Sequence, residues 1–208
     1  MRALSSGFRR FAAASGMLDA ALAWRSAPPV ILMFHGVSGS DSFDGLRNAA
    51  QLHLPRETFI AQLRLLKRHR RVIGLTEMVQ SLQSGDDLTG TVALTFDDGY
   101  ENNVLHAAPA LADFGMPASF FLATAHIGTG RWIWTDRIEH AFDRTSRGEL
   151  DWDGQRWSLA DLEARRTALR AIKSRLKTFT VDQRDRSLDQ IVDALGENTP
   201  QALSLIHI

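Results

Sequence analysis

The stretch VALTFDDGY, residues 92–100, decides the fold class. Five uncharged residues run into two adjacent carboxylates, Asp97 and Asp98, followed by a glycine and the chain's only tyrosine. A continuous apolar run without alternation is typical of a strand buried on both faces, as in a parallel sheet. The acid pair therefore ends such a strand, at the edge where α/β proteins place their active sites.

Two other apolar runs repeat this pattern, VILMF at 30–34 and SFFLA at 119–123, and both are predicted to be buried strands. Residues 102–114 between the acid pair and the second run predict a helix, bent by the internal Pro109. Strand, helix and strand at this spacing predict parallel pairing through right-handed crossovers. The predicted fold class is α/β.

Shorter elements are predicted between the first two strands. A helix should follow Pro55 with three apolar residues on one face: Phe59, Leu63 and Leu66. The run RRVIG, 70–74, predicts a short strand, and Thr76 is predicted to cap a helix that ends near Gly85.

The sequence changes character after residue 130, where no strongly apolar strand occurs. LDWDGQRW, 150–157, alternates around Asp153-Gly154, which predicts a hairpin. Helices are predicted on both sides of it: one over 131–142, one capped by Ser158 and reaching about Lys177, and one over about 182–195 that ends at Gly196.

Composition excludes several classes of protein. The 208 residues are 44% hydrophobic, so a packed core is expected. Lys plus Arg and Asp plus Glu number 24 each, and this balance argues against a nucleic-acid binder. Without cysteine the chain has no disulfide, thiolate metal site or Cys nucleophile.

The N-terminal segment FAAASGMLDAALA, 11–23, follows two arginines and has two interpretations. A cleaved signal peptide is disfavoured by Gly16 and Asp19, whereas an amphipathic helix explains the spacing of the apolar residues Phe8, Phe11, Leu18 and Leu22. No run of about 18 apolar residues occurs, so no membrane span is predicted. A cytoplasmic or membrane-peripheral location is favoured.

The acid pair itself has three interpretations from the residues alone. Asp and Gly after a strand often form only a turn. Two adjacent carboxylates repel each other, however, and a bound cation or a proton relieves this, which favours a functional site. A P-loop ATPase would need a G-x-x-x-x-G-K-[ST] loop and a serine hydrolase a G-x-S-x-G turn, and neither pattern occurs.

LTFDDGY followed by APALADFGMPASFFL resembles the polysaccharide deacetylase family, carbohydrate esterase family 4, whose core is the NodB homology domain. ILMFHGV and the segment HLPRETFIAQLRLLKRHRRVIGLTEMVQSLQSG are similar to one branch of that family, so the resemblance covers roughly residues 28–140. It implies a distorted (β/α) barrel and metal-dependent hydrolysis of N-acetyl groups on a polysaccharide or amino sugar. The implied partner is an N-acetylated carbohydrate.

The resemblance also implies roles for individual residues. Asp97 is the general base that takes the proton of the attacking water, and Asp98 is a ligand of a divalent metal, with Zn²⁺ favoured. Its position at the end of the first strand, on the face predicted for the acids, gives His35 two interpretations: it contacts the substrate or the residues that hold the metal, or it is a hydrogen-bonded structural histidine. Tyr100 shapes the entrance and has no assigned chemistry.

Several aromatic and histidine side chains have both a functional interpretation and a packing interpretation. Trp132, Trp134 and Asp136 could line a sugar-binding edge, but core packing is the commoner use of tryptophan and is favoured. His106 and His140 are expected to be ordinary helix residues.

Several family motifs have no counterpart here. The sequence holds no H-[ST]-x-x-H segment, which supplies two metal-binding histidines in the family, and residues 1–202 hold neither the later Arg-Pro turn nor the Leu-x-His strand. A metal held by one carboxylate lacks ligands. This leaves two interpretations: a non-catalytic carbohydrate-binding or scaffold protein on the same fold, or an incomplete and inactive piece of an enzyme.

The last six residues, LSLIHI at 203–208, also bear on completeness. They equal one reading frame of the reverse complement of a transposon end used as a sequencing adapter. This favours a truncated reading frame with four parts: an N-terminal helix and linker at 1–27, the first part of the deacetylase domain at 28–140, a mostly helical insertion with a hairpin at 141–202, and a non-native tail at 203–208.

Overall fold

The computed structural model describes residues 27–39, 46, 48 and 51–196. The predicted N-terminal helix and the tail at 203–208 lie outside the described residues. The chain divides into two compact units, the first up to Gly39 with Leu54–Leu122, and the second from Ser40–His53 with Ala123 onward.

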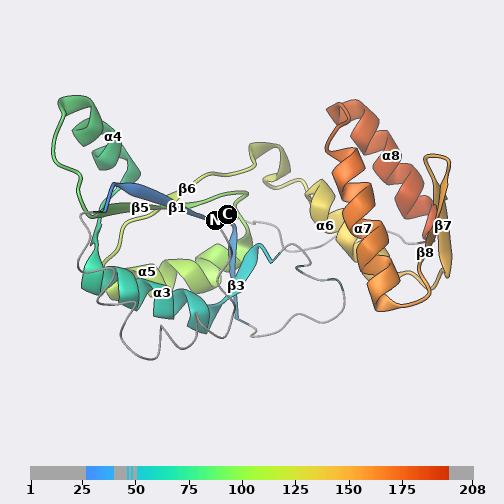
Figure 1. The fold of residues 1–208 in the computed structure, drawn as a ribbon, viewed down its shortest axis with the longest axis horizontal. Helices are drawn as coiled ribbons and strands as arrows, with labels where there is room; N and C mark the ends of the chain where they lie inside the picture. The colour runs from blue at the N-terminus through green and yellow to red at the C-terminus, as the bar shows by residue number, and fades with distance from the viewer. Residues whose placement is uncertain (1–26, 40–45, 47, 49–50, 197–208) are drawn as a thin grey trace. The chain divides into compact units, whose positions relative to one another are not determined.

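The sheet of the first unit has four parallel strands (Figure 1): β1 (Val30–Phe34), β4 (Arg71–Val72), β5 (Thr91–Phe96) and β6 (Ser119–Phe120). β5 is central, because β1 pairs with it from Val92 to Phe96 while β4 pairs at its start and β6 at its end. Since β1 occupies one edge of β5, β4 and β6 share the other edge. The predicted α/β class with parallel pairing is confirmed.

Helices cover both faces of this sheet: α3 (Arg56–His69), α4 (Leu75–Ser84), a π-helix η1 (Asn103–Ala107) and α5 (Ala108–Phe114). Figure 1 shows α3 and α5 on one face and α4 on the other. As predicted, α3 follows Pro55 and buries Phe59, Leu63 and Leu66. Alternation along β5 serves both faces, since Leu94 packs in the α3–α5 cluster while Ala93 packs with Met78 of α4.

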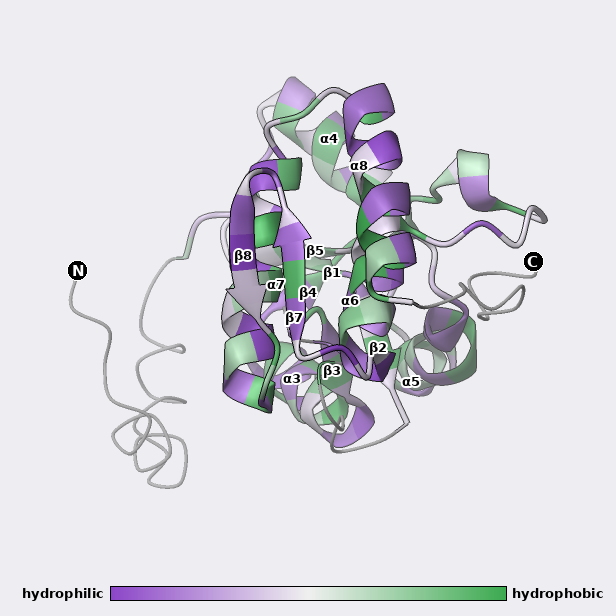
Figure 2. Cartoon of the chain, turned by 90° about the vertical axis from the view of Figure 1, so that its right-hand side faces the viewer, coloured by the Kyte–Doolittle hydropathy of each residue, from purple (hydrophilic) through white to green (hydrophobic). Residues whose placement is uncertain are grey.

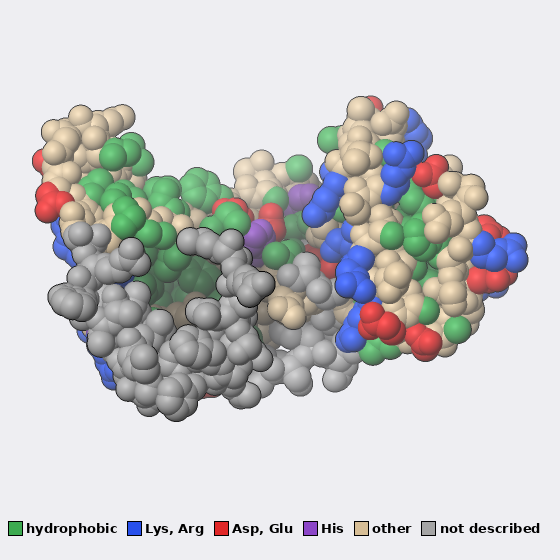
Figure 3. Space-filling model, viewed as in Figure 1, with side chains coloured by type: hydrophobic (Ala, Val, Ile, Leu, Met, Phe, Trp, Pro, Cys, Tyr) green, Lys and Arg blue, Asp and Glu red, His purple; other side chains and the backbone are tan. Residues whose placement is uncertain are grey.

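The predicted full burial of the first and third strands is wrong. Ile31 and Met33 of β1 are 54% and 59% exposed, because α4 packs over Ile73 and Ala93 on that face. The third strand pairs only over Ser119–Phe120, and Phe121 beyond it is 51% exposed. Figure 3 shows hydrophobic side chains gathered on the surface beside α4.

The second unit is built from helices α6 (Trp134–Arg144), α7 (Leu162–Leu176) and α8 (Val181–Ala194), a short 3-10 helix η2 (Thr124–His126), and a hairpin of β7 (Glu149–Trp152) and β8 (Gln155–Ser158). The helices are amphipathic and share one apolar core, which includes Phe142, Ile172 and Ile191 (Figure 2). Lys173 of α7 also contacts Glu139 of α6 at 2.5 Å, and both side chains are nearly buried.

A two-stranded sheet of β2 (Gly36–Ser38) and β3 (His53–Pro55) completes the described elements.

The hairpin predicted over 150–157 is confirmed. Glu149 pairs with Ser158 and Trp152 with Gln155 in antiparallel register. The two turn residues Asp153 and Gly154 have φ values of 52° and 73°, the left-handed conformation that a two-residue type I′ turn requires.

Two predicted helix caps are wrong. α4 begins one residue after Gly74, so Thr76 lies inside its first turn, although Gly85 does end the helix in the left-handed conformation. Ser158 belongs to β8, where pairing with Glu149 removes it from a capping position. Asp161 caps α7 instead, by accepting a hydrogen bond from the Ala164 N–H at 2.8 Å.

Within the described part of the chain, no helix combines the length and the apolar character needed to cross a membrane.

Candidate active site at the end of β5

Asp97 is held at the carboxyl end of the sheet by the backbone. All six residues of β5 are buried, and the Asp97 N–H donates to the Phe34 carbonyl of β1 at 2.9 Å. The β1–β5 ladder therefore continues one residue past the strand and fixes where the acid pair begins.

The backbone turns sharply at the second acid. Asp98 has a φ of 69° and Gly99 of 75°, and the Gly99 N–H donates to the Asp97 carbonyl at 2.8 Å. Adjacent side chains of an extended strand project to opposite faces, and a left-handed residue ends that alternation. Aspartate tolerates this conformation better than most residues, which suits it to this turn. The turn interpretation and the site interpretation of the pair are thus compatible.

His35 lies at the same edge, since it follows Phe34, whose Cα pairs with that of Phe96. Its backbone carbonyl accepts a hydrogen bond from Asn103 Nδ2 at 2.8 Å. The structure therefore brings His35 and the two acids to the ends of adjacent strands, as the sequence predicted. Their chemical roles stay predictions.

Asn103 is a residue of this site that sequence reasoning missed. It is 1% exposed, its N–H donates to the Tyr100 carbonyl at 2.9 Å, and its side chain joins the end of β1 to the helix that follows the acids. Its Oδ1 has no hydrogen-bond partner among the described residues. Tyr100 itself is buried. The only sequence signal for Asn103 was its position in the first turn after DDGY.

The prediction of a bent α-helix after the acids is wrong. The segment begins as a π-helix and continues as α5. Pro109 explains this, because it has no N–H with which to continue the α-helical ladder. π-helical turns are rare in proteins, and those that occur often lie at functional sites. The turn also places the His106 ring against Gly39, where an added Cβ would lie 2.9 Å from the ring.

A metal site cannot be completed from the described residues. No group of three or more His, Cys, Asp or Glu side chains among them is arranged to hold a metal ion. A zinc site needs at least three protein ligands. Asp98 could supply one of them, so the described residues do not fit a complete zinc centre.

The aromatic residues of the second unit pack as the sequence favoured. Trp132 is 7% exposed and its ring meets that of His140 at 5.0 Å, edge to face. Trp134 packs against the core of the second unit. Both tryptophans also line a cavity, described below, whereas Asp136 does not.

Comparison with known proteins finds a family model whose match includes the acid pair. The family model described as polysaccharide deacetylase matches residues 84–168, which include Asp97 and Asp98. This segment is similar to the polysaccharide deacetylase family over less than half of the chain. The match begins after His35 and extends past residue 140 into α7.

A curated relative has the same family in its name. YxkH of Bacillus subtilis (strain 168), whose name describes it as a polysaccharide deacetylase, is 33% identical over 101 residues. The match covers 47% of this chain and 33% of the relative, so the chain spans about a third of the relative's length.

Two solved structures are also similar. The IcaB structure from Ammonifex degensii is 25% identical with a TM-score of 0.44, over 55% of this chain and 48% of that one. The deacetylase PplD of Streptococcus pyogenes, solved with acetate, is 21% identical with a TM-score of 0.43, over 55% and 52%.

Proposed function

We propose that this chain carries part of the active site of a carbohydrate N-deacetylase, a hydrolase that releases acetate from N-acetylated sugars. The observation that supports this most is the acid pair held at the carboxyl end of β5, within the segment that matches the family. The substrate is an N-acetylated polysaccharide or amino sugar.

In this proposal Asp97 accepts a proton of the attacking water, whose oxygen bonds to the acetyl carbonyl carbon. When the amide C–N bond then breaks, the sugar nitrogen takes up one proton, which balances the proton held by Asp97, and acetate leaves. Asp98 is an oxygen ligand of a divalent metal, with Zn²⁺ favoured, and His35 contacts the substrate or supports the acids. Because the described residues do not complete a zinc centre, no step is assigned to the metal.

The same proposal extends to the fold. The four parallel strands with α3, α4 and α5 are proposed to be the first part of a distorted (β/α) barrel. The helices and hairpin over 141–202 are proposed to be an insertion after the third core strand.

A non-catalytic carbohydrate-binding or scaffold protein on the same fold is the second candidate. It is favoured by the incomplete ligand set among the described residues. Metal content separates the two candidates, because only the enzyme requires a divalent ion.

Acetate release tests the enzyme proposal. We expect the 208-residue chain alone to release none from chitin oligomers, peptidoglycan or an N-acetylated exopolysaccharide, because the part of it that the structure describes presents too few metal ligands. A longer natural protein that contains residues 28–140 and an H-[ST]-x-x-H segment should release acetate and hold a divalent metal.

In that longer protein, Asp97→Asn should abolish acetate release and keep the metal, whereas Asp98→Ala should lose metal measured by mass spectrometry. Removing a catalytic base typically costs about 10²–10⁴-fold in rate. The exposed Asp113→Asn on α5 is the charge-matched control and should change neither. Full activity in both acid variants would refute the assigned roles, and a folded, metal-free, inactive protein would favour the second candidate.

A further inference from the structure

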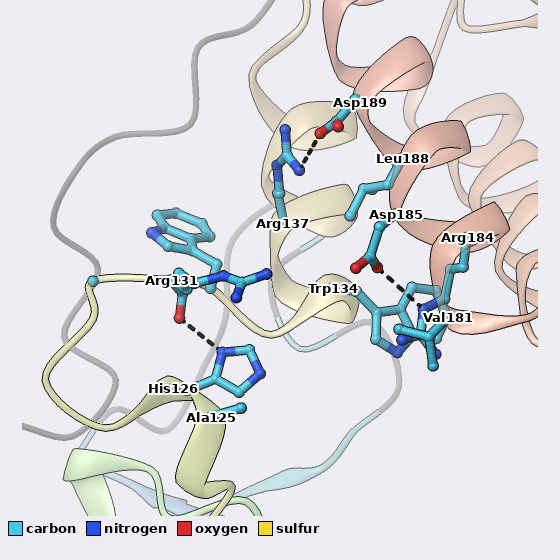
Figure 4. A pocket seen from close by; sticks show the side chains of 12 residues that line it. Ala125, His126, Arg131, Trp134, Arg137, Val181, Arg184, Asp185, Leu188 and Asp189 are labelled. Atoms are coloured by element: carbon cyan, nitrogen blue, oxygen red, sulfur yellow. Dashed lines mark hydrogen bonds and ion pairs between the residues drawn. The ribbon is translucent and has the colours of Figure 1, made fainter.

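The second unit contains a cavity of about 590 Å³ between α6, α8 and the loop that precedes α6. Small-molecule sites typically measure about 300–1,000 Å³, so a sugar fits this space. Three arginines and two aspartates are among the residues that line it. Figure 4 shows Arg131 reaching from the loop toward Arg137 of α6 and Asp185 of α8.

Two of the arginines are held in place by neighbours. Arg137 contacts Asp189 at 2.6 Å, which joins α6 to α8. The Arg184 guanidinium lies over the Trp134 ring at 5.2 Å, with its Nε 3.7 Å from Asp185. Guanidinium groups fixed in this way lose little conformational entropy when they bind a ligand.

The third arginine differs from the other two. No carboxylate among the described residues lies within ion-pair distance of the Arg131 guanidinium. Its loop is nevertheless ordered, because the Arg131 carbonyl hydrogen-bonds the His126 ring at 2.9 Å and its N–H donates to Thr129 Oγ1 at 3.2 Å. Among the described residues of the cavity, Arg131 is therefore a cation without an ion-pair partner, on a loop that hydrogen bonds hold in place.

Two nitrogen atoms of other cavity residues have no hydrogen-bond partner among the described residues. Arg184 Nε and Trp132 Nε1 are buried and have no hydrogen-bond partner among the described residues. Buried donors are normally satisfied, so these two mark a place where acceptor oxygens are missing. Asp185 and Asp189 offer acceptors in turn, which suit hydroxyl groups.

We propose that this cavity binds an acidic sugar, with the sugar carboxylate on Arg131 and the sugar hydroxyls on Asp185 and Asp189. Arginine binds carboxylates with two parallel hydrogen bonds, which explains a free guanidinium at the rim. An inorganic anion would satisfy the arginine, but it has no hydroxyl group to donate to Asp185 or to the second carboxylate oxygen of Asp189, whose Oδ1 already contacts Arg137. That the sugar is a unit of a glycan substrate rests on the proposed function, whereas the binding itself does not.

Titration of the full chain with sodium glucuronate, glucose and sodium sulfate at constant ionic strength tests this, with affinity measured by calorimetry and by the NMR signals of the arginine Nε groups. We expect glucuronate to bind and to shift the Arg131 signal. Arg131→Gln should weaken glucuronate binding by about tenfold or more, the loss expected for a charged hydrogen bond. Arg170→Gln on the exposed face of α7 removes the same charge outside the cavity and should bind as the unchanged chain does.

Three results would overturn the proposal: no glucuronate binding, sulfate binding without glucuronate binding, or equal weakening by both substitutions. Glucose binding with the same affinity as glucuronate would also overturn the proposal, because the carboxylate would then contribute nothing to binding. The Asp97→Asn variant should bind glucuronate with unchanged affinity, because Asp97 does not line the cavity. A failure of the acidic-sugar proposal can therefore be told apart from a failure of the deacetylase proposal.

Discussion

Asn103 shows at the residue scale how one buried amide positions a candidate active site. Its Nδ2 donates to the carbonyl of His35, and its own N–H belongs to the turn that follows the acids. The strand end at His35 and the turn after the acids are therefore linked through a single residue, which is 1% exposed.

Asn103→Ala should lower the free energy of unfolding by about 1–3 kcal/mol, because the His35 carbonyl loses the donor of a partly buried hydrogen bond. Chemical denaturation measures this. Val104→Ala is the control on the same π-helix, where the side chain is 56% exposed, and should change stability by less than about 0.5 kcal/mol. Equal stability of both variants would show that the Asn103 bond does not contribute.

The hairpin illustrates the scale of the element. β7 and β8 pair without slippage because the two-residue turn at Asp153 and Gly154 has the twist of the strands it joins. Arg156 also contacts Asp151 across the hairpin at 2.9 Å, and this hydrogen bond lowers the pKa of Asp151. Both groups are exposed, so the turn rather than the ion pair decides the register.

Gly154→Ala should destabilise the second unit by about 1 kcal/mol or more, because Gly154 has a φ of 73° that a side chain disfavours. Gly148→Ala is the matched control, since Gly148 has no positive φ and a Cβ there would meet no atom within 4 Å. Hydrogen exchange of the β7 and β8 amides reports the effect. Loss of protection in the control and not in Gly154→Ala would contradict this account of the turn.

At the scale of the whole molecule, the sheet of the first unit is unevenly covered in the described residues. Leu94 of β5 is fully buried under α3 and α5, whereas Ile31 of β1 is 54% exposed on the opposite face. Exposed apolar side chains of this kind favour association between molecules.

Ile31→Ser should therefore change the free energy of unfolding by less than about 0.5 kcal/mol and should reduce aggregation measured by light scattering. Leu94→Ala on the same sheet should cost about 2–5 kcal/mol, because it leaves a cavity in a closed core. A large loss of stability in Ile31→Ser would mean that this face is covered in solution.

Local patterns in the sequence were enough for β5, the position of the acid pair and the type I′ hairpin. Each of these follows from a few adjacent residues, such as the apolar run before Asp97 or the pair Asp153-Gly154, whose backbone preferences act locally. The parallel pairing also followed, because strand, helix and strand at this spacing have few topologies. For the site, the sequence predicted His35, Asp97 and Asp98 at one edge.

Only the tertiary structure decided the remainder. Burial of β1 and β6 depended on which helices reach them, so apolar composition misled at Ile31 and Phe121. The bond from Asn103 to His35 joins residues far apart in the chain, and so does the ion pair of Arg137 with Asp189 in the cavity. Such contacts have no periodic signal in the sequence. The partner of an arginine or asparagine on a helix depends on which residues tertiary packing brings beside it.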